Sequence, residues 1–191
     1  MENTENNQNG KDNIQIQPQK SNAISGTFDF LEMIVYVLCF VILITTFLFR
    51  PAVVQHSSMS KTLEENDTLI ISNLLYTPKR GDIIVFQDTK IDDGQALVKR
   101  IIAVGGDRIK VVDGRVTVND VFLKEDYVYF SDTDYHKPIE LTVPDGKLFV
   151  MGDHRDYSLD SRNFGCIDED CVVGRVLFRI LPLDKFGSVY G

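Results

Sequence analysis

The stretch "ALVKRIIAVGGDRIKVVDGRVTV", residues 96–118, decides the fold of this chain. It consists of short runs rich in β-branched residues, separated by Gly-Gly-Asp and by Asp-Gly, which are turn signals. Its second half places Asp-Gly between two segments of alternating character, the pattern of a hairpin closed by a two-residue turn. The stretch therefore predicts strands rather than helices.

Similar runs on both sides extend this prediction to most of the chain. They are "DTLIISNLL" (67–75), "GDIIVFQ" (81–87), "KLFVMGD" (147–153) and "CVVGRVLFRILPL" (171–183). We predict a mainly β domain over residues 51–191, built as a twisted sheet or barrel. A small β excursion from the main sheet is expected at about residues 107–142.

The N-terminal part differs sharply in composition. Residues 1–26 are rich in Asn and Gln and poor in apolar residues, which predicts a disordered polar tail. Residues 33–49 carry no charge, and at 1.5 Å per residue such a run approaches the roughly 30 Å of a bilayer core. We predict a membrane helix over 27–50. The alternative, a buried core helix, would normally show a polar stripe.

The flanking charges end the predicted anchor but do not orient it. Arg50 can extend its charge to the interface, and Pro51 cannot continue a helix. Two lysines precede the run and two basic residues follow it, so the positive-inside rule favours neither direction.

The overall composition excludes two classes of function. The formal net charge of −8 argues against a nucleic-acid partner, because phosphate binding needs a basic face. The three histidines, His56, His136 and His154, are far apart in sequence, and there is no Cys-x-x-Cys pair. The sequence therefore predicts no metal site and no cofactor.

The stretch "QHSSMSKTL", residues 55–63, follows the predicted anchor. Two adjacent serines at this place fit an ordinary polar linker. They also fit a nucleophile, but a nucleophilic serine needs a base from another part of the fold.

Lys99 is the candidate base. Side chains alternate along a strand, so Lys99 and Arg100 point to opposite faces, each among apolar neighbours. A buried lysine can lose its proton, because burial lowers its pKa by up to about 3–5 units. The alternative is a lysine on an edge strand that prevents aggregation.

The third informative stretch is "MGDHRDYSLDSRNFG", residues 151–165. Its polar side chains fit either a solvated loop or a network of ion pairs that positions another group. A hydroxyl in such a network could bond an adjacent amine. The charged residues are Asp153, Arg155, Asp156, Asp160 and Arg162, with Ser158 and Ser161 between them.

The chain resembles the bacterial type I signal peptidases in the order of its parts. These parts are the anchor and then the motifs "SSMSKTL", "RGDIIVF", "LVKRIIAVGGD" and "MGDHRDYSLDSR". The signal peptidases are membrane proteases that use a serine and a lysine, and the resemblance covers about residues 33–184. It implies a twisted β-sheet or barrel catalytic domain with one N-terminal transmembrane helix.

The resemblance implies a role for each matching position. Ser58, immediately before Met59, would be the nucleophile, and Lys99 the general base. Ser158 would orient the lysine amine, and Asp160 and Arg162 would support the site. Met59 would lie close to the substrate.

The resemblance also implies the substrates and the setting. Such enzymes cleave signal peptides from secreted preproteins after small residues of the Ala-x-Ala type, through an acyl-enzyme. The catalytic domain would face outward and the tail would be cytoplasmic. Preproteins, membrane lipid and a nearby secretion translocon would be the partners.

Two positions depart from the family pattern. His56 stands where relatives usually have Ser or Gly, and in some relatives that Ser helps to bind the oxyanion. His56 could replace this donor or stand aside. Lys61 stands where relatives usually have Pro, and a second amine near Lys99 would lower the pKa of Lys99.

Some features stay open at this level. Cys39 is expected to be a small packing residue in the anchor. Cys166 and Cys171 could form a disulfide or remain two separate thiols. A catalytically silent relative that binds signal peptides is one alternative function. A self-cleaving repressor-type protease is another, but the anchor and the lack of a helical DNA-binding module oppose it.

Overall fold

The computed structural model describes residues 23–129 and 137–190. Most of the predicted tail, 1–26, lies outside this part, as does His136 in the predicted β excursion. Residues 23–26, at the end of the predicted tail, belong to a helix.

Helix α1 (Ala23–Leu48) contains one stretch that is long and apolar enough to cross a membrane, Gly26–Ile44, with a mean hydropathy of 2.3. None of the side chains of the apolar window is buried, which contradicts a buried core helix and fits a membrane anchor. The helix ends at Leu48 rather than at residue 50, because Arg50 already belongs to a strand.

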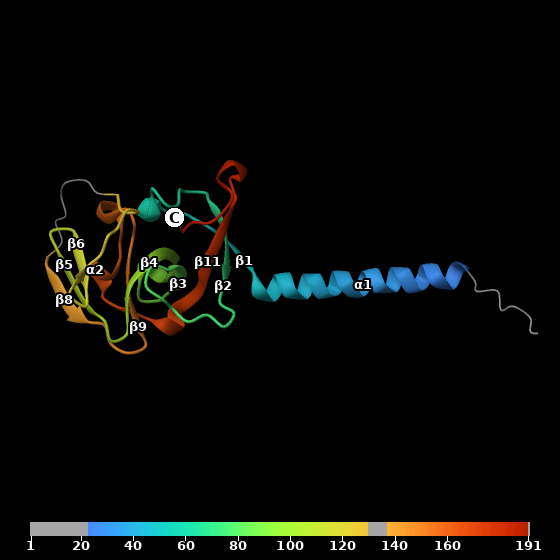
Figure 1. The fold of residues 1–191 in the computed structure, drawn as a ribbon, viewed down its shortest axis with the longest axis horizontal. Coiled ribbons are helices and arrows are strands. Elements are labelled where there is room, and N and C mark those ends of the chain that lie inside the picture. Colours follow the sequence, from blue (N-terminus) through green and yellow to red (C-terminus); the bar gives the residue numbers. More distant parts are fainter. Residues whose placement is uncertain (1–22, 130–136, 191) are drawn as a thin grey trace, which may run out of the picture. The chain divides into compact units, whose positions relative to one another are not determined.

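The remaining chain is mainly β, as predicted (Figure 1). Its larger sheet has seven antiparallel strands in the order β1-β2-β11-β3-β4-β9-β10. The bounds are β1 (Arg50–Val53), β2 (Thr68–Ser72), β3 (Ile83–Gln87), β4 (Ala96–Val104), β9 (Lys147–Met151), β10 (Ile167–Asp168) and β11 (Val172–Leu181).

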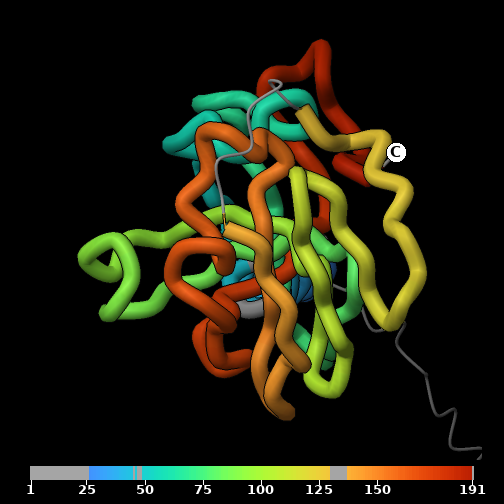
Figure 2. Tube along the Cα trace, turned by 90° about the vertical axis from the view of Figure 1, so that its left-hand side faces the viewer, coloured from blue at the N-terminus to red at the C-terminus, as the bar shows by residue number. Residues whose placement is uncertain are grey.

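A second, four-stranded sheet is built from the region of the predicted β excursion. Its order is β7-β6-β5-β8, and Figure 2 shows these strands side by side in yellow-green to orange. Val112 pairs with Arg115 across Asp113 and Gly114, which both have positive φ angles of 48° and 70°. The predicted Asp-Gly hairpin is thus confirmed, with the backbone twist that a two-residue turn requires. The bounds are β5 (Arg108–Val112), β6 (Arg115–Val118), β7 (Val121–Phe122) and β8 (Ile139–Thr142).

Short helical turns connect the strands. They are η1 (Ser57–Met59), η2 (Asp92–Gly94), η3 (Arg155–Tyr157), α2 (Ser161–Phe164), η4 (Glu169–Cys171) and η5 (Leu183–Lys185). Turn η1 is fixed to the core, because Met59 and nearby Leu63 are fully buried beside Leu69 and Val176. A separate cluster, which includes Ile109 and Phe149, packs the smaller sheet against β4 and β9.

Candidate active site

Strand β4 carries Lys99 into the interior of the larger sheet. The strand lies between β3 and β9, so Lys99 is not on an edge strand and the edge-lysine alternative is wrong. Lys99 pairs with Ile84 of β3, and Arg100 pairs with Ile83. These two residues are only 2% and 5% exposed, so the strand buries two consecutive basic residues on opposite faces.

Ser58 lies beside the Lys99 amine. Lys99 Nζ and Ser58 Oγ are 2.7 Å apart, which is hydrogen-bond distance. Ser58 is 7% exposed, whereas neighbouring Ser57 is exposed. The buried Met59 side chain anchors the turn, and thereby holds Ser58 against a residue 41 positions further along the chain.

Burial lowers the pKa of Lys99 from 10.5 to about 8. The charges of Asp160, Asp92 and Asp153 act in the opposite direction, but they do not offset the loss of solvation. Lys99 forms no ion pair within residues 23–129 and 137–190. A pKa of about 8 leaves about a tenth of the amine neutral at pH 7, far more than an ordinary lysine, and a general base requires this neutral form.

Arg100, in contrast, is fully paired. Its Nε and Nη2 atoms bond the two oxygens of Asp153 at 2.8 and 2.6 Å, and its guanidinium lies 3.9 Å from the centre of the Tyr127 ring. Thr62 Oγ1 donates to the same carboxylate at 2.5 Å. Burial disfavours the Arg100 charge, yet the hydrogen bond and charge of Asp153 raise the pKa of Arg100 above its ordinary value.

The ion pairs of the stretch 151–165 differ in part from the predicted network. Asp153 pairs with Arg100, and Arg155 pairs with Glu125 at 2.5 Å, so these two residues do not pair with each other. The reason is that Asp153 lies towards Arg100 of strand β4, whereas Arg155 lies towards Glu125 in the segment that follows β7. Asp160 and Arg162 do pair within the stretch, as a buried contact of 2.9 Å.

The pair of Asp160 and Arg162 fixes the start of the loop as well as its end. Asp160 Oδ2 accepts from the Gly152 backbone N–H at 3.0 Å, and Asp160 caps α2 together with Asn163. Although burial acts to raise the pKa of Asp160, the hydrogen bonds and charge of Arg162 and the Gly152 amide lower it overall. Asp160 is thus an anion that ties both ends of the loop together.

Ser158 belongs to the same loop and lies beside Gly152. A Cβ atom on Gly152 would come within 2.3 Å of Ser158 Oγ and 2.5 Å of the Ser58 carbonyl oxygen, so only glycine fits between these two residues. The Ser158 hydroxyl helps to lower the pKa of Asp160. It makes no hydrogen bond of normal geometry in the described part of the chain, so the predicted bond to the Lys99 amine is not formed here. Its orienting role stays a prediction.

The two departures from the family pattern lie on opposite sides of η1. His56 precedes the turn, is exposed and makes no hydrogen bond that caps it. Lys61 follows the turn, and its amine donates to the carbonyls of Asp126 at 2.5 Å and Val128 at 3.3 Å. The φ angle of Lys61 is 83°, which proline cannot adopt. This turn therefore has a conformation that the usual residue could not share.

Sequence reasoning missed several residues around the site, namely Thr62, Gly152, Glu125 and Tyr127. Glu125 and Tyr127 belong to the polar, aromatic segment, but they have no local pattern that points to Arg155 or Arg100. Glu125 meets Arg155 across 30 residues of sequence, so only the folded chain brings them together. Gly152 could have been identified from the sequence, because it stands directly before Asp153 in the motif "MGDHRDYSLDSR".

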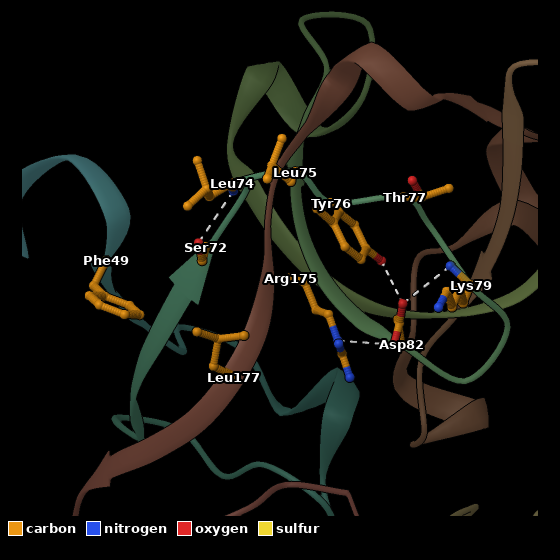
Figure 3. Close-up of a pocket in the computed structure, with 10 residues that line it drawn as sticks. All are labelled: Phe49, Ser72, Leu74, Leu75, Tyr76, Thr77, Lys79, Asp82, Arg175 and Leu177. Carbon is orange, nitrogen blue, oxygen red and sulfur yellow. Dashed lines mark hydrogen bonds and ion pairs between the residues drawn. The ribbon is translucent and has the colours of Figure 1, made fainter. Parts of the chain in front are cut away.

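The hollows on the β domain include two of similar size. One, of about 610 Å³, adjoins the site and includes Lys61, Thr62, Arg100 and Tyr127 in its lining. The other, of about 590 Å³, is shown in Figure 3 and contains none of the predicted site residues. At its base Asp82 accepts from Tyr76 at 2.8 Å and pairs with Arg175 at 3.0 Å, which closes a structural network.

The cysteines add no cross-link. Cys39, Cys166 and Cys171 are all free thiols in the structure, which agrees with the alternative of two separate thiols at positions 166 and 171. Burial raises the pKa of both Cys166 and Cys171, so neither is an activated nucleophile.

Comparison with known proteins adds an independent line of evidence. The family model described as signal peptidase, peptidase S26, matches residues 27–181. The chain is 33% identical over 168 residues to a probable signal peptidase I-1 of Synechocystis, covering 83% of this chain and 85% of the relative. It is 32% identical over 180 residues to signal peptidase IB of Staphylococcus aureus strain Mu50, covering 83% and 93%.

A relative from Leptolyngbya laminosa, signal peptidase I, is 36% identical over 155 residues, with 76% of this chain and 75% of the relative covered. Among solved structures, a signal peptidase I from Enterococcus faecalis V583 is 33% identical. The match covers 52% of this chain and 97% of that one, with a TM-score of 0.46.

Proposed function

Because the chain belongs to the signal peptidase family, peptidase S26, we propose that it is a membrane-anchored serine endopeptidase with Ser58 as nucleophile and Lys99 as general base. It removes N-terminal signal peptides from secreted preproteins after small residues of the Ala-x-Ala type. The observation that carries this proposal is the 2.7 Å contact between Ser58 Oγ and the buried amine of Lys99. The lowered pKa of that amine, about 8, supports it.

The proposed reaction has two steps. Neutral Lys99 takes the Ser58 proton as Ser58 Oγ attacks the scissile carbonyl, and the Ser58 backbone N–H stabilises the oxyanion. The Lys99 ammonium then gives its proton to the departing amine, which leaves an ester on Ser58. A water molecule, deprotonated by Lys99, hydrolyses that ester and restores both side chains.

The supporting residues act on this pair through the loop 152–162. Asp160 and Arg162 hold Gly152 in place, and Gly152 lies against the Ser58 backbone. Ser158 has a buried hydroxyl beside the same backbone, which supports a role in orienting the Lys99 amine during the reaction. These residues position the reacting groups and do not exchange protons with the substrate.

The anchor gives the proposed enzyme its place. An apolar helix of this length holds the β domain at a membrane surface, where a translocated cleavage site emerges. We propose that the β domain faces outward, that the tail is cytoplasmic, and that the translocon lies nearby. The substrate would bind as an extended strand, with shallow apolar pockets that select small side chains.

The test is cleavage of several preproteins by the detergent-solubilised full chain, beside Ser58→Ala and Lys99→Ala. We expect the parent to release signal peptides and both variants to be inactive. Cleavage that persists in Ser58→Ala contradicts the assignment of the nucleophile. A parent that binds signal peptides but cuts none is the catalytically silent relative instead. Mass spectrometry of the products identifies the cleavage site.

A further inference from the structure

His154 contacts the turn that carries Ser58 through both its backbone and its ring. We propose that His154 is a positioning residue that orients the Ser58 backbone N–H as oxyanion donor. The inference rests on the proposed function, because it gives a residue of the same site a role in the same reaction.

The contacts lie on the two peptide groups that flank Ser58, and the ring contact falls on the group that supplies the Ser58 N–H. The His154 backbone N–H donates to the Ser58 carbonyl at 3.0 Å, and the ring Nδ1 atom lies 3.3 Å from the Ser57 carbonyl oxygen. The Ser57 carbonyl and the Ser58 N–H belong to the same trans peptide bond. In a planar trans peptide these two groups point in opposite directions. A donor that holds the carbonyl therefore fixes the direction of the N–H.

The same carbonyl has two further donors, both from Ser60. The Ser60 backbone N–H lies 2.9 Å from the Ser57 oxygen, and Ser60 Oγ lies 2.6 Å from it. Hydrogen bonds accepted by an amide oxygen polarise the amide and make its N–H a stronger donor. With His154 added, the Ser57–Ser58 peptide is both oriented and polarised before any charge develops on a substrate, which is the arrangement that stabilises an oxyanion.

His154 is itself held in place. Its ring makes an edge contact with Tyr129, with 4.9 Å between ring centres, and a tilted contact with Tyr157 at 4.8 Å. The Tyr129 N–H donates to the Asp153 carbonyl at 2.9 Å, so the backbone beside His154 is also fixed. Two aromatic neighbours restrict rotation of the ring and keep Nδ1 towards Ser57. The ring donates whenever Nδ1 carries a hydrogen, in one neutral tautomer and in the imidazolium form.

This role matters more here because of His56. That residue stands where some relatives have a hydroxyl donor, and its side chain is exposed and makes no capping hydrogen bond to η1. The Ser58 N–H then carries most of the oxyanion stabilisation, and its orientation becomes correspondingly important.

The test compares His154→Phe with His154→Asn in the detergent-solubilised full chain. Phenylalanine keeps the ring contacts but removes the donor, so kcat should fall about three- to tenfold, the worth of one hydrogen bond, with KM unchanged. Asparagine places an amide N–H close to the former Nδ1 position and should recover most of the loss. Thermal unfolding of each variant confirms that the fold is intact.

Ser60→Ala is the companion variant, because it removes another side-chain donor from the same carbonyl and leaves His154 in place. We expect a smaller fall in kcat, again without a change in KM. The inference is overturned if His154→Phe and Ser60→Ala both keep the parental kcat. It is also overturned if His154→Asn is as slow as His154→Phe, or if the loss lies in KM. The proposed function is tested separately. It stays valid if the parent cleaves and Ser58→Ala does not, whatever the His154 and Ser60 variants do.

Discussion

The two faces of strand β4 treat neighbouring basic residues in opposite ways. Arg100 meets both oxygens of Asp153 and the ring of Tyr127, and its pKa is raised. Lys99 meets the hydroxyl of Ser58 and, among the residues that the structure describes, pairs with no carboxylate; its pKa is lowered to about 8. Both side chains are almost completely buried. Burial is thus common to both, and the partner that the fold supplies decides whether the charge is kept or can be given up.

The comparison has an energetic side. A shift of the Lys99 pKa from 10.5 to about 8 corresponds to about 3 kcal/mol of destabilisation when the amine is protonated. Arg100 has its charge compensated, so its removal would leave Asp153 buried without its ion-pair partner. The buried amine of Lys99 therefore lowers the stability of the fold but supports catalysis. The buried guanidinium of Arg100, paired with Asp153, stabilises the fold.

The largest expected effect is that of Lys99→Met. Removal of the base should lower kcat by about 10⁴-fold, and the free energy of unfolding at pH 7 should rise by up to about 3 kcal/mol. The unfolded chain binds more protons than the folded one between pH 8 and 10.5, so the gain is full below pH 8 and disappears as the pH approaches 10.5. Cleavage assays and denaturant titrations at several pH values measure both quantities.

Ser58→Ala is the matched control for this variant, because it abolishes cleavage but keeps the buried amine. It should show no comparable gain in stability. A Lys99→Met variant that is less stable than the parent at pH 7 would contradict the idea that Lys99 is held at a cost.

Arg100→Met tests the opposite face. It leaves the Asp153 carboxylate buried without its partner, so we expect a loss of about 3–5 kcal/mol in the free energy of unfolding. The double variant Arg100→Met with Asp153→Leu removes both charges and should recover part of this loss. Denaturant titration at pH 7 measures the difference, and a single variant as stable as the parent would show that the ion pair contributes nothing.

The smallest effect concerns the pH dependence of the parent. With a Lys99 pKa of about 8, only about a tenth of the amine is neutral at pH 7 and about nine tenths at pH 9. We expect kcat/KM to rise about tenfold over this interval, with a midpoint near pH 8. Rates on a peptide without titrating groups in this range give the profile, and a flat profile would contradict Lys99 as the base.

Lys61→Met sharpens that measurement. The Lys61 amine bonds the carbonyls of Asp126 and Val128, and burial lowers the pKa of Lys99. We therefore expect the midpoint of the profile to stay unchanged. A rise of the midpoint would show that the Lys61 charge also acts on Lys99, as the sequence suggested for two nearby amines.

The sequence by itself determined the features that depend on local pattern. The uncharged run gave the apolar helix, β-branched runs gave the strands, and Asp113-Gly114 gave the hairpin, because backbone preference and alternation act over a few residues. The alternation along residues 97–102 also predicted opposite faces for Lys99 and Arg100, and the strand pairing agrees with it. Lys99 was a candidate base from the pattern of its own strand, and the family resemblance of the motifs selected Ser58 rather than Ser57.

Only the tertiary structure decided which partner each charge meets. Arg100 meets Asp153 across 53 residues, and Arg155 meets Glu125 across 30, so no local spacing encodes either pair. The stretch 151–165 left its ion-pair partners open, and only the fold assigns Asp153 to Arg100 and Arg155 to Glu125. The same holds for the 2.7 Å contact of Lys99 with Ser58. A pKa depends on solvation and on neighbours in space, and both exist only once the chain has folded.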